Sequence, residues 1–240
     1  LSLGVVGIAL GTALLPLLSR QLRSGDADAA CDSINRALEL SALLILPATV
    51  ALLLIASPIV AVLFGHGAFT PQDTVATAAA LVAFTIGLPA YVLVKILSTG
   101  FFAREDTVTP VRVAVVSMVV NIAASLLLIG PLGHVGVALA TAIAAWLNTL
   151  VLTAILVRRR AWYIDPRLRH RLIRIILASV AMGLVLWVLE PILASNLTDT
   201  LVERVGALIA LIVAGIVVYF AAAFGLGAVS AADIRDQLHK

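Results

Sequence analysis

Long apolar stretches separated by short charged segments dominate the sequence. The stretches without Asp, Glu, Lys or Arg cover residues 40–72, 74–94, 113–157, 175–189 and 205–232. A helix needs about 20 apolar residues to cross the hydrocarbon core of a bilayer. Apolar and polar residues do not alternate as they do in the strands of a membrane barrel. The pattern therefore predicts membrane-spanning helices.

Turn and capping residues divide these stretches into separate spans. Gly130-Pro131-Leu132-Gly133-His134 interrupts the longest stretch. Thr70-Pro71-Gln72-Asp73 is typical of a capped helix start, and Thr109-Pro110 and Asp165-Pro166 resemble it. We predict an all-α, polytopic membrane protein, a bundle of about seven transmembrane helices at 3–18, 37–64, 74–101, 110–129, 135–157, 172–189 and 203–228. Prolines inside these spans are expected to kink them, as Pro89 would in the span 74–101.

The remaining segments are expected to be short. Apolar residues recur at helical spacing around Cys31 and Ile34, so residues 19–36 are interpreted as a cytoplasmic amphipathic connector that runs into the second span. Residues 229–240 are expected to form a polar cytoplasmic tail. The first span, 3–18, is short and begins close to Leu1. We therefore expect the chain to be the C-terminal part of a longer protein, cut inside a helix.

The composition of the 240 residues excludes several classes of protein. Hydrophobic residues make up 62% of the chain and charged residues only 12%, against about 25% charged in soluble domains. A soluble enzyme of this size could not bury so much apolar surface. The single cysteine, Cys31, cannot form an intrachain disulfide, and no metal site is expected.

The basic residues predict the orientation of the spans. Of the 16 basic residues, 14 fall in the first, third and fifth interhelical loops and in the tail. By the positive-inside rule these loops and the C-terminus are cytoplasmic, and loops 65–73 and 190–202 lie on the other side. This distribution explains the net charge of +3 better than nucleic-acid binding does. The arginines of 158–174 set topology, with contacts to anionic lipid headgroups as a second role.

Few residues inside the spans could carry chemistry. The sequence lacks a Gly-rich phosphate loop, an HExxH motif and an arrangement of Ser, His and Asp suited to catalysis, so we expect no enzyme. Lys95 either snorkels to the cytoplasmic interface or lines a wet cavity, where its charge would suit an anionic substrate. Asn121 and Ser125 lie one turn apart, and Thr141 lies on the next, antiparallel helix. These three could form a site or simply bond the helices together.

Several motifs, in order and spacing, resemble a known family of transporters. They are LPLLSR at 15–20, LFGHGAFT at 63–70, GLPA at 87–90, VKIL at 94–97, GFFAREDT at 100–107, TPVR at 109–112 and GPLGHVG at 130–136. Together they resemble the MurJ/MviN family of lipid II flippases, within the multidrug/oligosaccharidyl-lipid/polysaccharide exporter superfamily. The resemblance is specific up to about residue 150.

The resemblance implies a two-lobe, 14-helix transporter, of which this chain would be the end of helix 8 plus helices 9–14. Such a protein moves the undecaprenyl-diphosphate-linked peptidoglycan precursor between leaflets of the bacterial inner membrane by alternating access, in cell-wall biosynthesis. The last two spans would form an apolar groove for the lipid tail. We expect Lys95, Arg104 and Arg112 to contact the substrate, and the missing N-terminal lobe and membrane lipids to be further partners.

The resemblance also implies a monovalent cation site. Asn121 and Thr141 match its pattern, whereas Ser125 stands where an acid is expected. No other cofactor is expected, and the membrane potential is an alternative driving force. Two other interpretations stay open: another exporter of the superfamily, such as a polysaccharide-repeat flippase or a drug/cation antiporter, or an accessory fragment without transport activity of its own.

Overall fold

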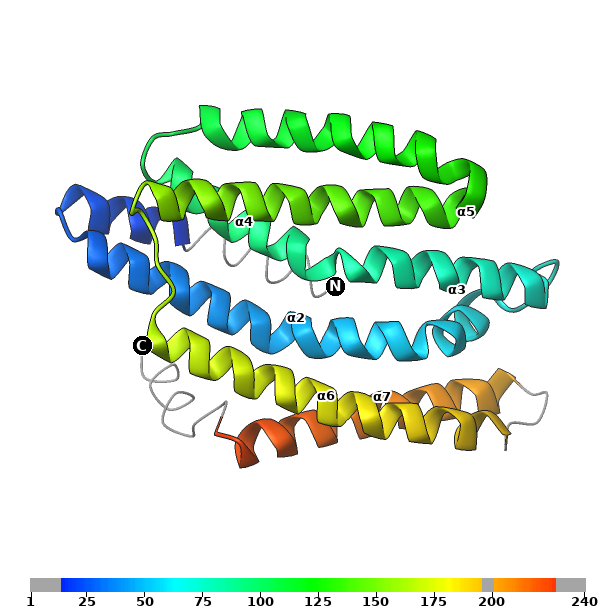
Figure 1. Cartoon of the computed structure of the whole chain (residues 1–240). Coiled ribbons are helices and arrows are strands. Elements are labelled where there is room, and N and C mark those ends of the chain that lie inside the picture. The colour runs from blue at the N-terminus through cyan, green and yellow to red at the C-terminus, as the bar shows by residue number, and fades with distance from the viewer. Residues whose placement is uncertain (1–13, 196–200, 228–240) are drawn as a thin grey trace. The chain divides into compact units, whose positions relative to one another are not determined.

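The structure is a computed structural model that describes residues 14–195 and 201–227. All regular structure in these residues is helical, which confirms the predicted all-α class. A helix over 14–23 is followed by α2 (Ala27–Phe64), α3 (Pro71–Ile86), α4 (Leu88–Phe102), α5 (Val108–Arg158), α6 (Pro166–Ser195) and α7 (Leu201–Gly225) (Figure 1). The first thirteen residues of the chain, which hold most of the predicted span 3–18, and the predicted tail 229–240 lie outside the described residues.

Among the described residues, five helical stretches are long and apolar enough to cross a membrane. These are Ala27–Phe64, Pro71–Phe102, Val108–Arg158, Pro166–Leu193 and Val202–Gly225. The chain divides into two compact units, and the boundaries fall inside α2, α3 and α6. Unit 1 holds the chain up to residue 45 and residues 79–169, and unit 2 holds 46–78 and 170 onward.

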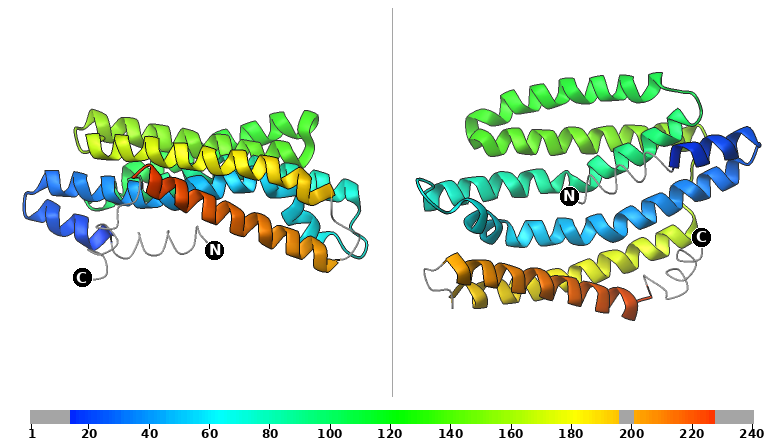
Figure 2. Two further views of the ribbon diagram at one scale, coloured as in Figure 1. Left: turned by 90° about the horizontal axis from the view of Figure 1, so that it is seen from below. Right: turned by 180° about the vertical axis from the view of Figure 1, so that it is seen from behind.

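Helix α5 of unit 1 is a hairpin. Its backbone reverses at Gly133, where φ is 56° and ψ is −136°. A residue with a side chain is strained at such a positive φ, so the turn depends on glycine. The two arms lie side by side and antiparallel (Figure 1; Figure 2, right), and they contain the predicted spans 110–129 and 135–157. A side chain at Gly136 would collide with the carbonyl of Leu128 on the other arm.

A break at Gly87 separates α3 from α4 inside the predicted span 74–101. Pro89, close behind, lacks the N–H that would continue the helical ladder. The second arm of α5 bonds the carbonyls around the break: Trp146 Nε1 donates to Ile86 O at 2.9 Å, and Thr149 Oγ1 donates to Ala90 O at 3.1 Å. These two bonds tie the chain on both sides of the break to the second arm of α5.

We expect Gly87→Ala to destabilise the protein. A Cβ atom there would lie 2.9 Å from Ala142 Cα, which is backbone and cannot move alone. Overpacking of this kind costs about 1–3 kcal/mol. Gly206→Ala is the matched control, because a Cβ at this helical glycine meets nothing within 4 Å and gains about 0.5–1 kcal/mol. Thermal unfolding of the purified chain in detergent measures both, and a Gly87→Ala midpoint at or above that of Gly206→Ala contradicts the packing argument.

Two of the predicted helix caps are confirmed and the third is wrong. Thr70 and Asp73 exchange bonds: Thr70 N donates to Asp73 Oδ2 at 2.9 Å, and Asp73 N donates to Thr70 Oγ1 at 3.2 Å. Asp165 Oδ1 accepts from Leu168 N at 2.6 Å. Helix α5, however, begins before Thr109, and Asp106 caps it by accepting from Thr109 N at 3.0 Å. A carboxylate is the stronger cap, because it carries full negative charge at the positive end of the helix.

Asp106 also joins the two ends of α5. Its Oδ2 accepts from Thr109 Oγ1 at 2.7 Å and pairs with Arg159 Nη1 at 2.6 Å. Hydrogen bonds from Thr109 and then from Arg159 lower the pKa of the Asp106 carboxyl to about 2. The carboxylate therefore stays charged, and its contribution to stability is lost only as the pH falls from about 4 toward 2.

The N-terminal part of α2 is anchored to the segment that follows α5. Asn35 is fully buried, accepts from Trp162 Nε1 at 2.8 Å and donates to Tyr163 O at 3.1 Å. The apolar residues predicted for the connector, such as Ile34, are buried inside unit 1. The connector itself is two helix ends joined by a turn at Gly25, where φ is 79°.

A charged cluster strengthens this anchor. Glu39 is only 6% exposed, and it pairs with Arg36 at 2.7 Å and with Arg167 at 3.7 Å. Arg36 also pairs with Asp165 at 3.4 Å. Arg167 belongs to the arginine-rich segment 158–174, so arginines predicted to set topology also hold the helix ends together.

Unit 2 consists of the second part of α2, the start of α3, and helices α6 and α7. A Cβ at Gly183 would lie 2.8 Å from Val50 Cγ1, so α6 packs closely on α2. Leu186 contacts Gly215, which joins α6 to α7. Helix α6 continues to Ser195, past the predicted end of its span at residue 189. The charge of Glu190 marked the predicted boundary, but a single carboxylate near a helix end does not interrupt the backbone ladder.

Candidate substrate site

A cavity of about 390 Å³ lies in unit 1 between α4 and the two arms of α5. It contains polar groups from all three segments, although the surrounding helices are strongly apolar. Its lining residues are Tyr91, Val94, Lys95, Ala114, Ser117, Met118, Asn121, Thr141, Ala144, Ala145 and Asn148.

Lys95 is the charged residue of this cavity. Its side chain is exposed and forms no ion pair with any residue in the described part of the chain. The break at Gly87 begins α4 only two turns earlier, and α4 packs on α5, so the fold presents Lys95 to the cavity. Lys95 therefore lines the pocket, and its contact with an anionic substrate stays a prediction.

Three buried polar atoms of the cavity have no hydrogen-bond partner in the described residues. They are Tyr91 Oη, Ser117 Oγ and Asn148 Oδ1. Buried polar groups without partners are rare in folded proteins, because each costs desolvation energy. All three belong to residues that line the same pocket as Lys95.

Sequence reasoning missed Tyr91 and Ser117. Both stand one helical turn before a residue that it had selected: Tyr91 before Lys95, and Ser117 before Asn121. Residues four apart share a helix face. This spacing was the signal that could have found them.

The residues predicted for a cation site come together. Asn121 Oδ1 accepts from Ser125 Oγ on the same arm of α5 at 3.4 Å, and from Thr141 Oγ1 on the other arm at 3.5 Å. Thr141 Oγ1 also donates to Val137 O at 3.0 Å. The group offers only neutral oxygens, and the described residues contain no cluster of three His, Cys, Asp or Glu side chains. Its role as a cation site stays a prediction.

The two predicted arginines do not join Lys95 in this cavity. Arg104 donates to Gly100 O at 2.7 Å and to Ala161 O at 2.6 Å, which ties the end of α4 to the segment after α5. Burial lowers the pKa of the Arg104 guanidinium. Arg112 is exposed on the first arm of α5. Neither lines the cavity.

A bundle of helices long enough to span a membrane, with a lysine on an open pocket between them, is consistent with a membrane transport protein. The chain belongs to the MurJ family: residues 1–205 match the family's sequence model, described as lipid II flippase MurJ. This confirms the resemblance seen in the motifs. The chain spans about 45% of the length of the curated relatives it matches.

Individual relatives agree with the family assignment. A probable lipid II flippase MurJ of Rhizobium meliloti (strain 1021) is 44% identical over the whole chain, which covers 45% of that protein. A probable lipid II flippase MurJ of Rickettsia prowazekii (strain Madrid E) is 33% identical over 95% of the chain and 45% of its own length. A solved lipid II flippase MurJ in an inward closed conformation superposes with a TM-score of 0.73 at 26% identity, over 92% of this chain and 43% of that one.

Proposed function

We propose that this chain is the C-terminal lobe of a lipid II flippase of the bacterial inner membrane. Its membership of the MurJ family and its partial coverage of the relatives support this proposal. In the complete protein the lobe works against a second lobe, and the substrate crosses between them by alternating access. The chain acts as a transporter component and not as an enzyme.

The observation that carries the proposal is the open, mostly apolar pocket that the charged Lys95 lines. A diphosphate headgroup needs positive charge and hydrogen-bond donors wherever it leaves water. The Lys95 ammonium supplies charge as a compact point donor. Tyr91, Ser117 and Asn148 add buried polar atoms to the lining, and these atoms would reach a headgroup only if their side chains turned toward the pocket.

Other groups complete the proposed cycle. Arg112, exposed on α5, contacts the headgroup as it enters. Arg104 holds the end of α4 through its two carbonyl contacts and so supports the cavity indirectly. Asn121, Ser125 and Thr141 bind a monovalent cation, or else the membrane potential alone drives transport. Because they lack a carboxylate, we propose a site of low affinity.

A depletion experiment tests the function. The complete protein is expressed in a bacterium whose own lipid II flippase is switched off, and lipid II exposed on the outer leaflet is measured. We expect exposure and growth to be restored. Restoration of growth through another lipid-linked sugar, without lipid II exposure, would favour a different exporter of the superfamily.

We expect the arginine-rich loops to face the cytoplasm. Cysteines placed at Asp73 and Arg160 in the complete protein, with Cys31 replaced, are exposed to an impermeant thiol reagent in intact cells. Both positions lie near helix ends in the structure, so the reagent can reach them. The expected result is labelling at position 73 and protection at position 160, as the positive-inside rule requires. The reverse pattern contradicts the proposed orientation.

A further inference from the structure

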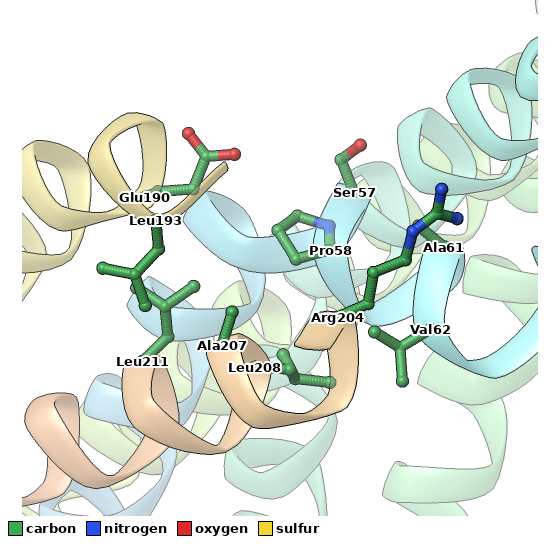
Figure 3. Close-up of a pocket in the computed structure, with 10 residues that line it drawn as sticks. All are labelled: Ser57, Pro58, Ala61, Val62, Glu190, Leu193, Arg204, Ala207, Leu208 and Leu211. Carbon is green, nitrogen blue, oxygen red and sulfur yellow. The ribbon is translucent and has the colours of Figure 1, made fainter. Parts of the chain in front are cut away.

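Unit 2 contains a second pocket, of about 290 Å³, lined by α2, α6 and α7 (Figure 3). Its lining is divided by polarity. The side chains of Ser57, Glu190 and Arg204 carry their polar tips to one side of the pocket. Apolar side chains, among them Leu208 and Leu211, form the rest of the lining. The pocket therefore has a mostly apolar lining, with one acidic and one basic side chain on one side.

The charged groups lie near the ends of their helices, where a membrane-spanning helix meets the lipid headgroups. Glu190 stands five residues before the end of α6, and Arg204 three residues after the start of α7. At 1.5 Å per residue they lie about 5–8 Å from the helix ends. Glu190 forms no hydrogen bond or ion pair with any residue in the described ranges. A carboxylate beside an apolar surface at this level is suited to pair with a cationic group.

We propose that this pocket binds a zwitterionic phospholipid with a primary amine, phosphatidylethanolamine. The ammonium of the lipid bonds to Glu190, its phosphate bonds to the guanidinium of Arg204, and the start of an acyl chain lies on the apolar part of the lining. Charge-assisted bonds of both kinds are the strong ones in proteins, and a guanidinium matches phosphate geometry. The pocket volume is at the lower end of the range for ligand sites, about 300–1,000 Å³, which suits a headgroup better than a whole lipid.

The charge pattern discriminates among membrane lipids. Phosphatidylglycerol has the phosphate but no ammonium, and its net negative charge is repelled by Glu190. Phosphatidylcholine has a quaternary ammonium that cannot donate a hydrogen bond to a carboxylate. The inference rests on the pocket of unit 2 alone and not on the flippase function, because the Lys95 cavity belongs to unit 1.

Native mass spectrometry tests the proposal. The chain is purified in detergent and equilibrated with equal amounts of phosphatidylethanolamine, phosphatidylcholine and phosphatidylglycerol of distinguishable mass. We expect retained phosphatidylethanolamine to exceed the other two. In Glu190→Gln the preference for phosphatidylethanolamine should fall about tenfold, as expected for loss of one charge-assisted bond. In Arg204→Gln the retained amount of all three lipids should fall about tenfold, because each of them carries a phosphate. Equal retention of the lipids, or a preference for phosphatidylglycerol, overturns the proposal.

Two further variants keep the test decisive. Glu203→Gln removes an exposed carboxylate next to Arg204 that does not line the pocket, and it should retain the wild-type preference. Ala207→Phe fills the apolar part of the pocket while leaving both charges in place, and it should lose the bound lipid. Thermal unfolding and helicity identify any variant that misfolds. If Glu203→Gln lowers the preference as much as Glu190→Gln, the effect is general electrostatics and the proposed site is wrong.

Discussion

Lys95→Ala in the complete protein is expected to reduce lipid II flipping by at least tenfold at unchanged protein level. Lys95 is the charged residue of the pocket, and Tyr91, Ser117 and Asn148 on the same lining hold buried polar atoms without a partner in the described residues. A hydrogen bond between charged groups contributes about 1.5–3 kcal/mol, and about 1.4 kcal/mol corresponds to a factor of ten. The measurement is lipid II exposed on the outer leaflet after depletion of the host flippase, normalised to the abundance of each variant.

Two comparisons separate the role of Lys95 from a general charge effect. Lys95→Arg should keep part of the activity, because it retains the charge while changing its shape. Arg158→Ala removes one positive charge at the exposed end of α5, outside the cavity, and should keep nearly all activity. Normal flipping by Lys95→Ala at wild-type abundance would show that Lys95 only snorkels to the interface.

Much of the fold was predictable because membrane-spanning helices require long apolar stretches, which are visible in the sequence. The charge-free stretches predict the helices, and the glycines around 130–133 predict the hairpin of α5, since only a tight turn allows two spans so close together. Capping residues such as Thr70 and Asp165 bind backbone N–H groups a few residues away, so their partners are local and visible in the sequence.

Interactions between distant residues were not predictable in the same way. The position of Lys95 at a cavity depends on how α4 packs against α5, which hydropathy does not encode. Arg104 was expected at the substrate, yet its guanidinium bonds to Ala161 O, 57 residues later in the chain. Asp106 caps α5 in place of Thr109, and its pair with Arg159, 53 residues later, could not be read from the local sequence.

The meeting of Asn121 with Ser125 and Thr141 is an intermediate case. The first pair follows from helical spacing, and the second follows once the turn between the arms is recognised. Geometry alone, however, does not decide whether neutral oxygens bind a cation or only each other. A cation site that needs a carboxylate from a distant segment is therefore hard to predict from this sequence alone.

Residues 1–240 alone are expected to insert into the membrane but not to flip lipid II. A charge at the bilayer centre costs about 2.5–3.5 kcal/mol or more unless it is compensated along its path. Within the described spans, Lys95 is the basic residue that lines the unit 1 cavity, and one point charge cannot line a route across the membrane. Alternating access also needs a second lobe. The chain spans only about 45% of the length of its curated relatives, so we infer that the compensating groups lie in the remainder.

Co-expression distinguishes an incomplete transporter from an inactive one. Three strains are compared. The first produces this chain alone, and the second produces it together with the missing N-terminal part from a second plasmid. The third is the same as the second except that this chain carries Lys95→Ala. Outer-leaflet lipid II is measured in each strain after depletion of the host flippase. We expect exposure only when both parts are present and Lys95 is intact, because the cavity supplies one segment of a path that the second lobe completes.

Rescue by the chain alone would show that the charges described in this lobe suffice, and it would contradict the two-lobe proposal. Failure of both co-expressed strains, with both parts inserted, would favour an accessory fragment without transport activity.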